Sequence, residues 1–70
     1  MYYQNQIIMK SIINIFGTKI EYKPFYNNAE RVWYSARFED GELDMVFDLR
    51  EFETKFECEL DCHKRISNLR

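Results

Sequence analysis

Hydrophobic and polar residues alternate most regularly on either side of Asp40-Gly41, over residues 32–38 and 43–47. Asp-Gly between two alternating runs is typical of a type I′ β-hairpin. A two-residue turn would bring the apolar side chains of both runs onto one face of a sheet. The expected pairs are Phe38–Leu43, Ala36–Met45 and Tyr34–Phe47. We therefore predict a hairpin whose core face carries these side chains.

The first apolar segment, residues 6–16, has the period of an amphipathic helix. At 100° per residue its apolar side chains, apart from Ile7, fall on one arc opposite the polar ones. Gly17 follows, where many helices end with a left-handed residue. We expect a helix here, although the five Ile residues of this segment would also suit a strand. Residues 1–5 are expected to form a loose tail.

The last third of the chain, residues 49–66, supports two interpretations. From residue 52 to 62, apolar and polar residues alternate as in a strand. At helical spacing, five side chains instead fall on one narrow arc of the helix, namely Leu49, Phe52, Phe56, Leu60 and His63. Asp48-x-x-Glu51 would form a capping box ahead of that helix, and two basic residues follow near its C-terminal end. These end signals favour the helix.

Residues 19–23 alternate as a short strand, and Pro24 places this strand at an edge or an end of a sheet. Together with the hairpin and the two helices, this predicts an α+β fold of order α-β-β-β-α. In that fold the N- and C-terminal helices cover one face of a three-stranded antiparallel sheet. A mainly-β meander of five strands is the alternative if both ambiguous segments are extended. With 70 residues, a single small domain spanning 1–70 is expected.

Charge is segregated along the chain, although the formal net charge is only −2. Residues 1–35 carry +2, residues 36–62 carry −7 and residues 63–70 carry +3. No apolar run approaches the roughly 20 residues of a membrane span, and no basic region opens a signal peptide. Cys58 and Cys62 are too closely spaced for a comfortable disulfide and suit a reduced protein. We therefore expect a cytoplasmic protein.

Few residue patterns support catalysis. The chain has one His and lacks a Gly-rich phosphate loop, a G-x-S-x-G turn and an H-E-x-x-H helix, so we expect neither an enzyme nor a cofactor. A metal site would have only Cys58, Cys62 and His63, one ligand short of a closed zinc site, and none is expected. Direct nucleic-acid binding is also disfavoured, because the element that would meet phosphates is acidic.

The acidic segment is the strongest candidate for a binding surface. On a helix, Glu53, Glu57 and Asp61 form one stripe, and on a strand they share the solvent face with Glu59. The hairpin tip adds four further acids, Glu39, Asp40, Glu42 and Asp44. Two interpretations are open. The acids either form a solvated face that keeps the protein soluble, or imitate phosphates and occupy the basic groove of a nucleic-acid-binding protein.

Trp33 is the candidate anchor for a partner protein. In the predicted hairpin it lies on the face opposite the core, where Arg37 meets Asp44. An exposed Trp often anchors a protein interface. On the helix interpretation, a second and thinner apolar stripe points away from the core and would suit a homodimer; it consists of Cys58, Cys62 and Leu69.

The amphipathic opener Ile8–Phe16, the Asp40-Gly41 hairpin and the Glu-rich element after Asp48 resemble small acidic phage-encoded inhibitors, the anti-CRISPR proteins among them. The richness in Asn, Ile, Lys and Tyr also suggests the AT-rich genome of many phages. The resemblance implies that the protein binds a nuclease effector and blocks its access to DNA. It identifies no site residues in this chain. We therefore expect a non-enzymatic inhibitor that acts as a DNA mimic. The alternative is a small dimeric accessory or antitoxin-like protein whose acidic face is merely solvated.

Overall fold

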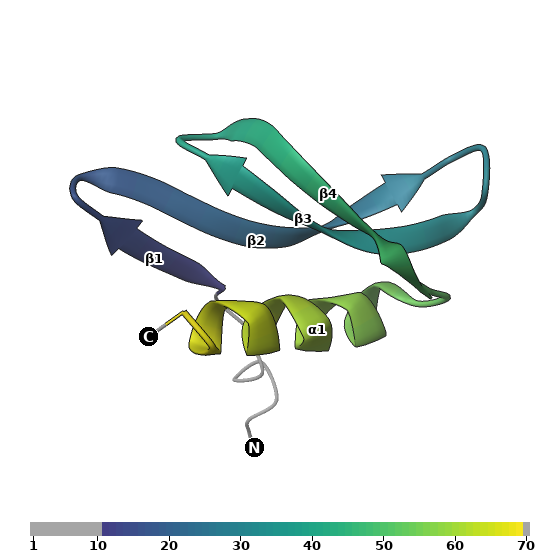
Figure 1. Ribbon diagram of the computed structural model, residues 1–70. Helices are drawn as coiled ribbons and strands as arrows, with labels where there is room; N and C mark the ends of the chain where they lie inside the picture. Colours follow the sequence, from purple (N-terminus) through teal and green to yellow (C-terminus); the bar gives the residue numbers. More distant parts are fainter. Residues whose placement is uncertain (1–10, 70) are drawn as a thin grey trace, which may run out of the picture.

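The computed structural model describes residues 11–69, which form a four-stranded antiparallel sheet with one helix packed across one face (Figure 1). The strands follow one another in space as they do in sequence, in the order β1-β2-β3-β4. Their bounds are Ile12–Ile15 for β1, Thr18–Asn27 for β2, Val32–Glu39 for β3 and Glu42–Phe52 for β4, and helix α1 covers Lys55–Ser67. The α+β class, the antiparallel sheet and the C-terminal helix are confirmed, whereas the three-strand order and the five-strand meander are both wrong.

The predicted N-terminal helix is wrong where the structure describes it, because residues 12–15 form strand β1. Phe16 and Gly17 connect β1 to β2 with φ angles of 50° and 82°, as a two-residue type I′ hairpin requires. Gly17 thus closes a hairpin instead of ending a helix, and the Ile side chains take the extended backbone that β-branched residues favour. Residues 6–10 and the expected tail 1–5 lie outside the described residues.

Strand β2 is longer than the predicted strand of residues 19–23 and runs through Pro24. Its pairing with β1 ends where Ile12 stands opposite Glu21. Within residues 11–69, Pro24 therefore lies on a stretch of β2 that has a strand neighbour on the β3 side only. Because proline has no N–H to donate to a ladder, this is the edge position that the sequence predicts for it.

The predicted β3–β4 hairpin is confirmed, with Asp40 and Gly41 in its turn at φ angles of 49° and 88°. The first predicted pair, Phe38–Leu43, is present. Beyond it, a β-bulge at Asp44 shifts the register by one residue, and the observed pairs are Arg37–Met45, Ala36–Val46 and Ser35–Phe47. The predicted pairs Ala36–Met45 and Tyr34–Phe47 are wrong, because a slip of one residue moves each side chain to the other face.

The face of β3 that packs against the helix is also the opposite of the predicted one. Ser35 points to the helix, where its Oγ donates to Asp61 at 2.5 Å. Trp33 shares this face and packs against the core, so its predicted position away from the core is wrong. Of the six side chains predicted for the core face, Tyr34 and Ala36 are buried. The other four are half-buried or exposed, namely Phe38, Leu43, Met45 and Phe47.

Helix α1 begins at Lys55, six residues after the predicted start, because β4 occupies most of the residues in between. Its N-cap is Thr54, whose Oγ1 accepts the Glu57 N–H at 3.2 Å. These two residues stand at the spacing of a capping box, with Thr54 Oγ1 also donating to Glu57 Oε1 at 3.1 Å, while the predicted box at Asp48 and Glu51 lies within β4. The basic last turn is present as predicted.

The helix turns its small side chains to the sheet. Cys58, Cys62 and Ile66 are at most 1% exposed, whereas Phe56 and Leu60 of the predicted core arc are 54% and 39% exposed. The predicted outer stripe of cysteines is thus the inner one, because thiols are small enough to let the helix lie close to the sheet. The core consists of Ile20, Tyr22, Phe52, Cys58, Cys62 and Ile66, with Ile13, Trp33 and Phe47 packed at its margin.

Candidate protein-binding edge

Strand β4 forms one margin of the sheet, and its outer side has no strand neighbour among residues 11–69. It is 11 residues long, whereas β1 at the other margin has four. A strand at a margin presents unpaired backbone N–H and C=O groups with which another strand can pair. Figure 1 shows that β4 approaches helix α1 only toward its C-terminal end. We call the residues Glu42–Phe52 the β4 edge.

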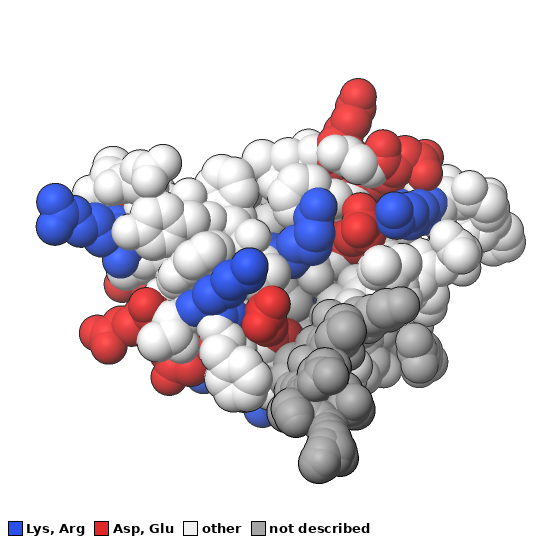
Figure 2. Space-filling model, turned by 180° about the vertical axis from the view of Figure 1, so that it is seen from behind, with Lys and Arg blue, Asp and Glu red and all other residues white. Residues whose placement is uncertain are grey.

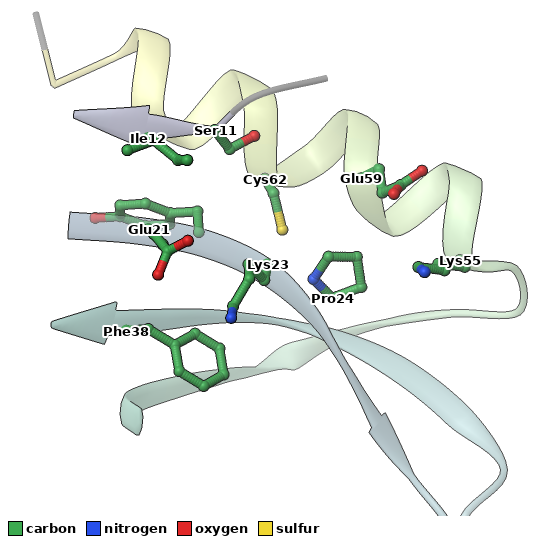
Figure 3. A pocket seen from close by; sticks show the side chains of 10 residues that line it. Ser11, Ile12, Glu21, Lys23, Pro24, Phe38, Lys55, Glu59 and Cys62 are labelled. Carbon is green, nitrogen blue, oxygen red and sulfur yellow. The ribbon is translucent and has the colours of Figure 1, made fainter. Parts of the chain in front are cut away.

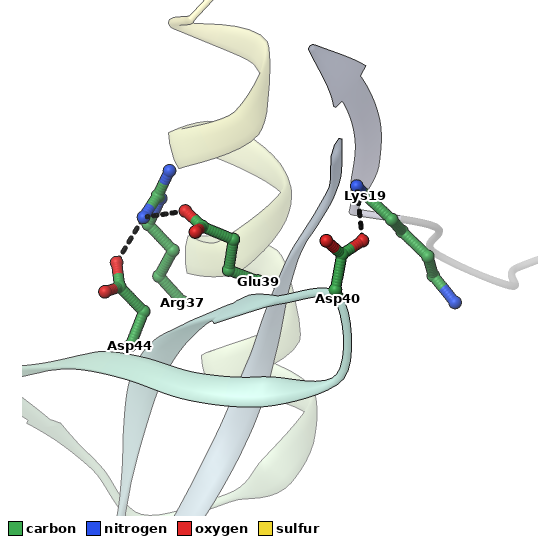
Figure 4. A network of polar contacts seen from close by, with 5 residues as sticks. All are labelled: Lys19, Arg37, Glu39, Asp40 and Asp44. Carbon is green, nitrogen blue, oxygen red and sulfur yellow. Dashed lines mark hydrogen bonds and ion pairs between the residues drawn. The ribbon is translucent and has the colours of Figure 1, made fainter. Parts of the chain in front are cut away.

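Acidic side chains predominate among the charged residues of the β4 edge. Its single base is Arg50, and its four acids are all exposed: Glu42, Asp44, Asp48 and Glu51. Asp44 forms an ion pair with Arg37 (Figure 4), as the sequence predicts, although the bulge removes the two residues from direct register. Within residues 11–69, neither Glu42 nor Asp48 forms an ion pair. The edge therefore presents negative charge that the described part of the chain does not neutralise.

The acids at the β3–β4 turn also hold the fold together. Asp40 Oδ1 accepts the Lys19 N–H at 3.0 Å (Figure 4), and the Asp40 N–H donates to the Lys19 carbonyl at 2.9 Å. Arg37 lies between Asp44 and Glu39, with its Nη1 3.4 Å from Glu39 Oε2. The hydrogen bond to Asp44 raises the pKa of Arg37 against the effect of burial. Asp40, a predicted binding residue, is thus largely engaged within the molecule.

A second irregularity shapes the middle of the β4 edge. Between the pairs Ser35–Phe47 and Trp33–Phe52, four residues of β4 stand opposite the single residue Tyr34. The hydroxyl of Tyr34 donates to Glu30, and Glu51 Oε2 lies 3.5 Å away. The bond to Glu30, together with burial, raises the pKa of Tyr34 to about 12. These contacts link the bulged part of β4 to the turn between β2 and β3.

Three large apolar side chains are exposed on the same edge. Leu43 and Met45 are 48% and 50% exposed, and Leu49, in the second bulge, is fully exposed. Because of the bulge at Asp44, Leu43 lies on the face of Phe38 whereas Met45 lies on the face toward the helix. A partner that pairs with this strand would cover both kinds of unsatisfied surface, the apolar side chains and the backbone groups.

The predicted acidic stripe along the helix does not form. Glu53 precedes the helix, and Glu57 belongs to its capping box. Asp61 has a side chain only 12% exposed and accepts from Ser35 Oγ at 2.5 Å and from Arg65 Nε at 2.7 Å. Burial alone would raise the pKa of Asp61, but these two hydrogen bonds outweigh it and hold the pKa below its ordinary value.

On the face shown in Figure 2, the acids are instead divided between two parts of the surface. Figure 2 shows acidic side chains mainly at its upper right and lower left, with Lys and Arg side chains between these groups. The first group lies where Figure 1 places the β3–β4 turn, and the second lies toward the connection between β4 and the helix. The sequence predicts one acidic face, whereas the fold separates the carboxylates according to the element that carries them.

Trp33, the predicted anchor, is not a free surface residue. Its ring packs against the core and lies tilted against the ring of Tyr26, with the ring centroids 4.9 Å apart. Tyr26 itself is 40% exposed. On the β4 edge the exposed apolar side chains are instead Leu43, Met45 and Leu49, and the sequence pattern assigns the first two to the core.

A groove of about 420 Å³ lies on the opposite side of the molecule, at the stretch of β2 beyond β1 (Figure 3). Its apolar floor includes Cys62 and Phe38, whose ring carries Lys23 Nζ at 4.4 Å from its centroid. Two lysines and two glutamates line it, Lys23, Lys55, Glu21 and Glu59, so its charges are balanced. Glu59, a predicted binding residue, thus faces this groove and not the β4 edge.

The nucleophilic and metal-ligating side chains are dispersed or shielded. Cys58 and Cys62 are free, buried thiols, and burial raises the pKa of Cys58 to about 11, which keeps it protonated and unreactive. His63 is exposed on the same helix. Within residues 11–69, no three His, Cys, Asp or Glu side chains are placed to hold a metal ion.

No helix of the described chain is long and apolar enough to cross a membrane. Comparisons of the protein with family models, with curated proteins and with solved structures found no match. The β4 edge, defined by its free backbone side, its acids and its exposed apolar side chains, is therefore the candidate site on which a function can be argued.

Proposed function

We propose that this protein is a non-enzymatic interaction protein that binds a basic surface of a partner protein through the β4 edge. The observation that carries the proposal is an 11-residue strand at the margin of the sheet, with four exposed acids and a single base. Complementary charge across an interface accelerates association and excludes partners of the wrong sign. A partner with clustered Lys and Arg side chains therefore suits this edge best.

The partner class that we favour is a protein that handles nucleic acid, such as an effector nuclease. Such proteins neutralise phosphates with Lys and Arg side chains, so their binding grooves are basic. The acids of the β4 edge could occupy part of such a groove and exclude the nucleic acid, which would make the protein an inhibitor. The burial of Cys58, Cys62 and Ser35, each at most 1% exposed, supports a non-enzymatic role, because a nucleophile must be accessible to its substrate.

A second candidate function is that of a small dimeric accessory or antitoxin-like protein. The exposed apolar side chains of Leu43, Met45 and Leu49 favour it, because a second copy could cover them. Pairing of two β4 edges would, however, bring together two strands that each carry four acids against one base. Like charges on neighbouring strands destabilise a sheet. A basic partner avoids this repulsion.

Light scattering and affinity capture distinguish the two functions. We expect a monomer in dilute salt, and we expect a captured basic partner to be released as the salt concentration rises, because salt screens exposed charges. A dimer that persists at all salt concentrations, together with no salt-sensitive partner, would favour the accessory protein. Glu42→Lys should weaken capture of the basic partner, whereas the matched control Glu59→Lys, which changes the net charge equally but lies at the groove on the other side, should not.

A further inference from the structure

We infer that the partner docks by strand addition: an extended basic segment pairs with the β4 edge and becomes the fifth strand of the sheet. This inference rests on the proposed function and specifies how the partner binds. Strand addition at a free sheet margin obtains affinity from backbone hydrogen bonds and specificity from the side chains that alternate beside them.

The first argument concerns the backbone of β4. Its inner side pairs with β3 from Glu42 to Phe47, interrupted only by the bulge at Asp44, while its outer side has no strand neighbour among residues 11–69. Figure 1 shows that the start of β4 is its part farthest from α1. The helix reaches the stretch only at its end, where the guanidinium of Arg65 lies 4.2 Å from the centroid of the Phe47 ring. The stretch Glu42–Phe47 is therefore already in the extended conformation that an incoming strand needs, so little ordering is required on this side of the interface.

The second argument concerns the residues beside that backbone. Leu43 and Met45 are each about half exposed, and they lie on opposite faces of the sheet because of the bulge. A strand paired with β4 has side chains on both faces of the sheet. It would therefore cover part of Leu43 on one face and part of Met45 on the other. Binding of a partner to only one face of the sheet would leave one of the two exposed.

The third argument concerns charge and decides the occupant. Glu42 and Asp48, near the two ends of this stretch, have no ion-pair partner within residues 11–69. Opposite charges in cross-strand positions stabilise a sheet, and like charges destabilise it. The edge therefore repels a second copy of itself, as charged margins of natural sheets commonly do, and accepts a segment in which Lys or Arg alternates with apolar residues.

The test uses a short peptide that alternates Lys and Val, titrated into the full chain and followed by amide resonances and hydrogen exchange. We expect binding, with added protection of amides confined to the stretch from Glu42 to Phe47. A matched peptide with N-methyl groups on alternate amides keeps every charge but loses donors, and we expect its affinity to be at least about tenfold weaker. Glu42→Lys with Asp48→Lys should weaken the unmodified peptide by a similar factor, whereas Glu59→Lys should not.

The outcomes separate this inference from the proposed function. Equal binding of the methylated and unmethylated peptides, or no binding of either, would overturn strand addition. If charge reversal on β4 still abolished capture of a basic partner in that case, the proposed function would stand without strand addition. If protection appeared on β4 but charge reversal left both peptide and partner binding unchanged, the strand would be added without charge selection. In that case the choice of a basic occupant would be wrong.

Discussion

Asp61 and Asp48 are the same kind of side chain in two different parts of the molecule. Asp61, between helix and sheet, is 12% exposed and accepts from Ser35 and Arg65. Asp48, on the β4 edge, is exposed and forms no ion pair within residues 11–69. The first carboxylate stabilises the fold, whereas the second is available to another molecule. A count of acids along the chain therefore says little about how many can bind a partner.

The loss of unfolding free energy on substitution should differ most between the two regions when an apolar side chain is truncated. Ile66 is 1% exposed at the helix–sheet interface, and Ile66→Ala should lower the free energy of unfolding by about 2–5 kcal/mol. Leu49 is fully exposed on the β4 edge, and Leu49→Ala should change it by less than about 0.5 kcal/mol. Urea denaturation measures both values. Should Ile66→Ala unfold the domain outright, Ile66→Val is expected to cost about 0.5–1.5 kcal/mol.

When a carboxylate is removed, the expected difference in unfolding free energy between the two regions is smaller. Asp61→Ala leaves the buried Ser35 hydroxyl without its acceptor and should cost about 2 kcal/mol of unfolding free energy. Asp48→Ala, as the matched control on the β4 edge, should cost less than about 0.5 kcal/mol. Equal losses for the two substitutions would show that the interface and the edge do not differ in the way that burial implies.

Asp61 and Asp48 should also differ in how far each makes the stability of the protein depend on pH. The pKa of Asp61 lies below its ordinary value, which is about 3.9 in an unfolded chain. Asp61 therefore contributes stability that is present above that pH and is lost as the pH falls through the folded-state pKa. Asp61→Asn should remove this part of the acid destabilisation, and Asp48→Asn should not. Identical profiles of stability against pH for Asp61→Asn and the unmodified protein would contradict the role given to Asp61.

A smaller loss of stability is expected from a substitution at the start of the helix. Thr54 caps the helix through its Oγ1, and Thr54→Ala should cost about 1 kcal/mol. Thr54→Ser, which keeps the oxygen, should cost clearly less, since Ser is at least as good an N-cap. Thermal unfolding measures the difference. A full loss in Thr54→Ser as well would mean that the methyl group, and not the cap, is what stabilises the helix.

The sequence was sufficient to predict the β3–β4 hairpin and its turn, because Asp40-Gly41 permits only a few backbone conformations. It was not sufficient for the register, because the bulge places one additional residue, Asp44, against β3 without any Gly or Pro to signal it. That single residue moves Met45 and Phe47 to the face of β3 that carries Ser35, so the predicted grouping of Phe47 with Tyr34 fails. The error at Trp33 has another cause: helix α1 packs on the face of β3 that carries Ser35 and Trp33.

The two ambiguous segments show a second limit. Residues 12–15 fit a helix and a strand equally well by period, and the hairpin at Phe16 and Gly17 decides between them. In helix α1 the pattern favours the larger apolar side chains as core, but the space beneath the helix accommodates the thiols of Cys58 and Cys62. The side chains of a helix that are buried against a sheet depend on the shapes of both surfaces. The sequence of the helix alone therefore cannot identify them.

For the candidate site, the sequence indicates that the acids matter but not which of them are available. Glu42 and Asp44 of the predicted set lie on the β4 edge, while Asp61 serves the fold and Glu59 faces the groove. The apolar part of the site was missed, because alternation in a hairpin marks Leu43 and Met45 as core. A strand at a sheet margin that has no strand neighbour within residues 11–69 is visible only after the sheet is assembled.

The most direct test of the β4 edge is to measure unfolding free energy and partner affinity on the same charge-reversed protein. Glu42→Lys combined with Asp48→Lys changes two exposed side chains, so stability should shift by less than about 0.5 kcal/mol. Affinity for a basic partner should fall by orders of magnitude, because like charges across an interface cost several kcal/mol. A folded double variant that binds the partner with unchanged affinity would contradict the assignment of this edge as the binding surface.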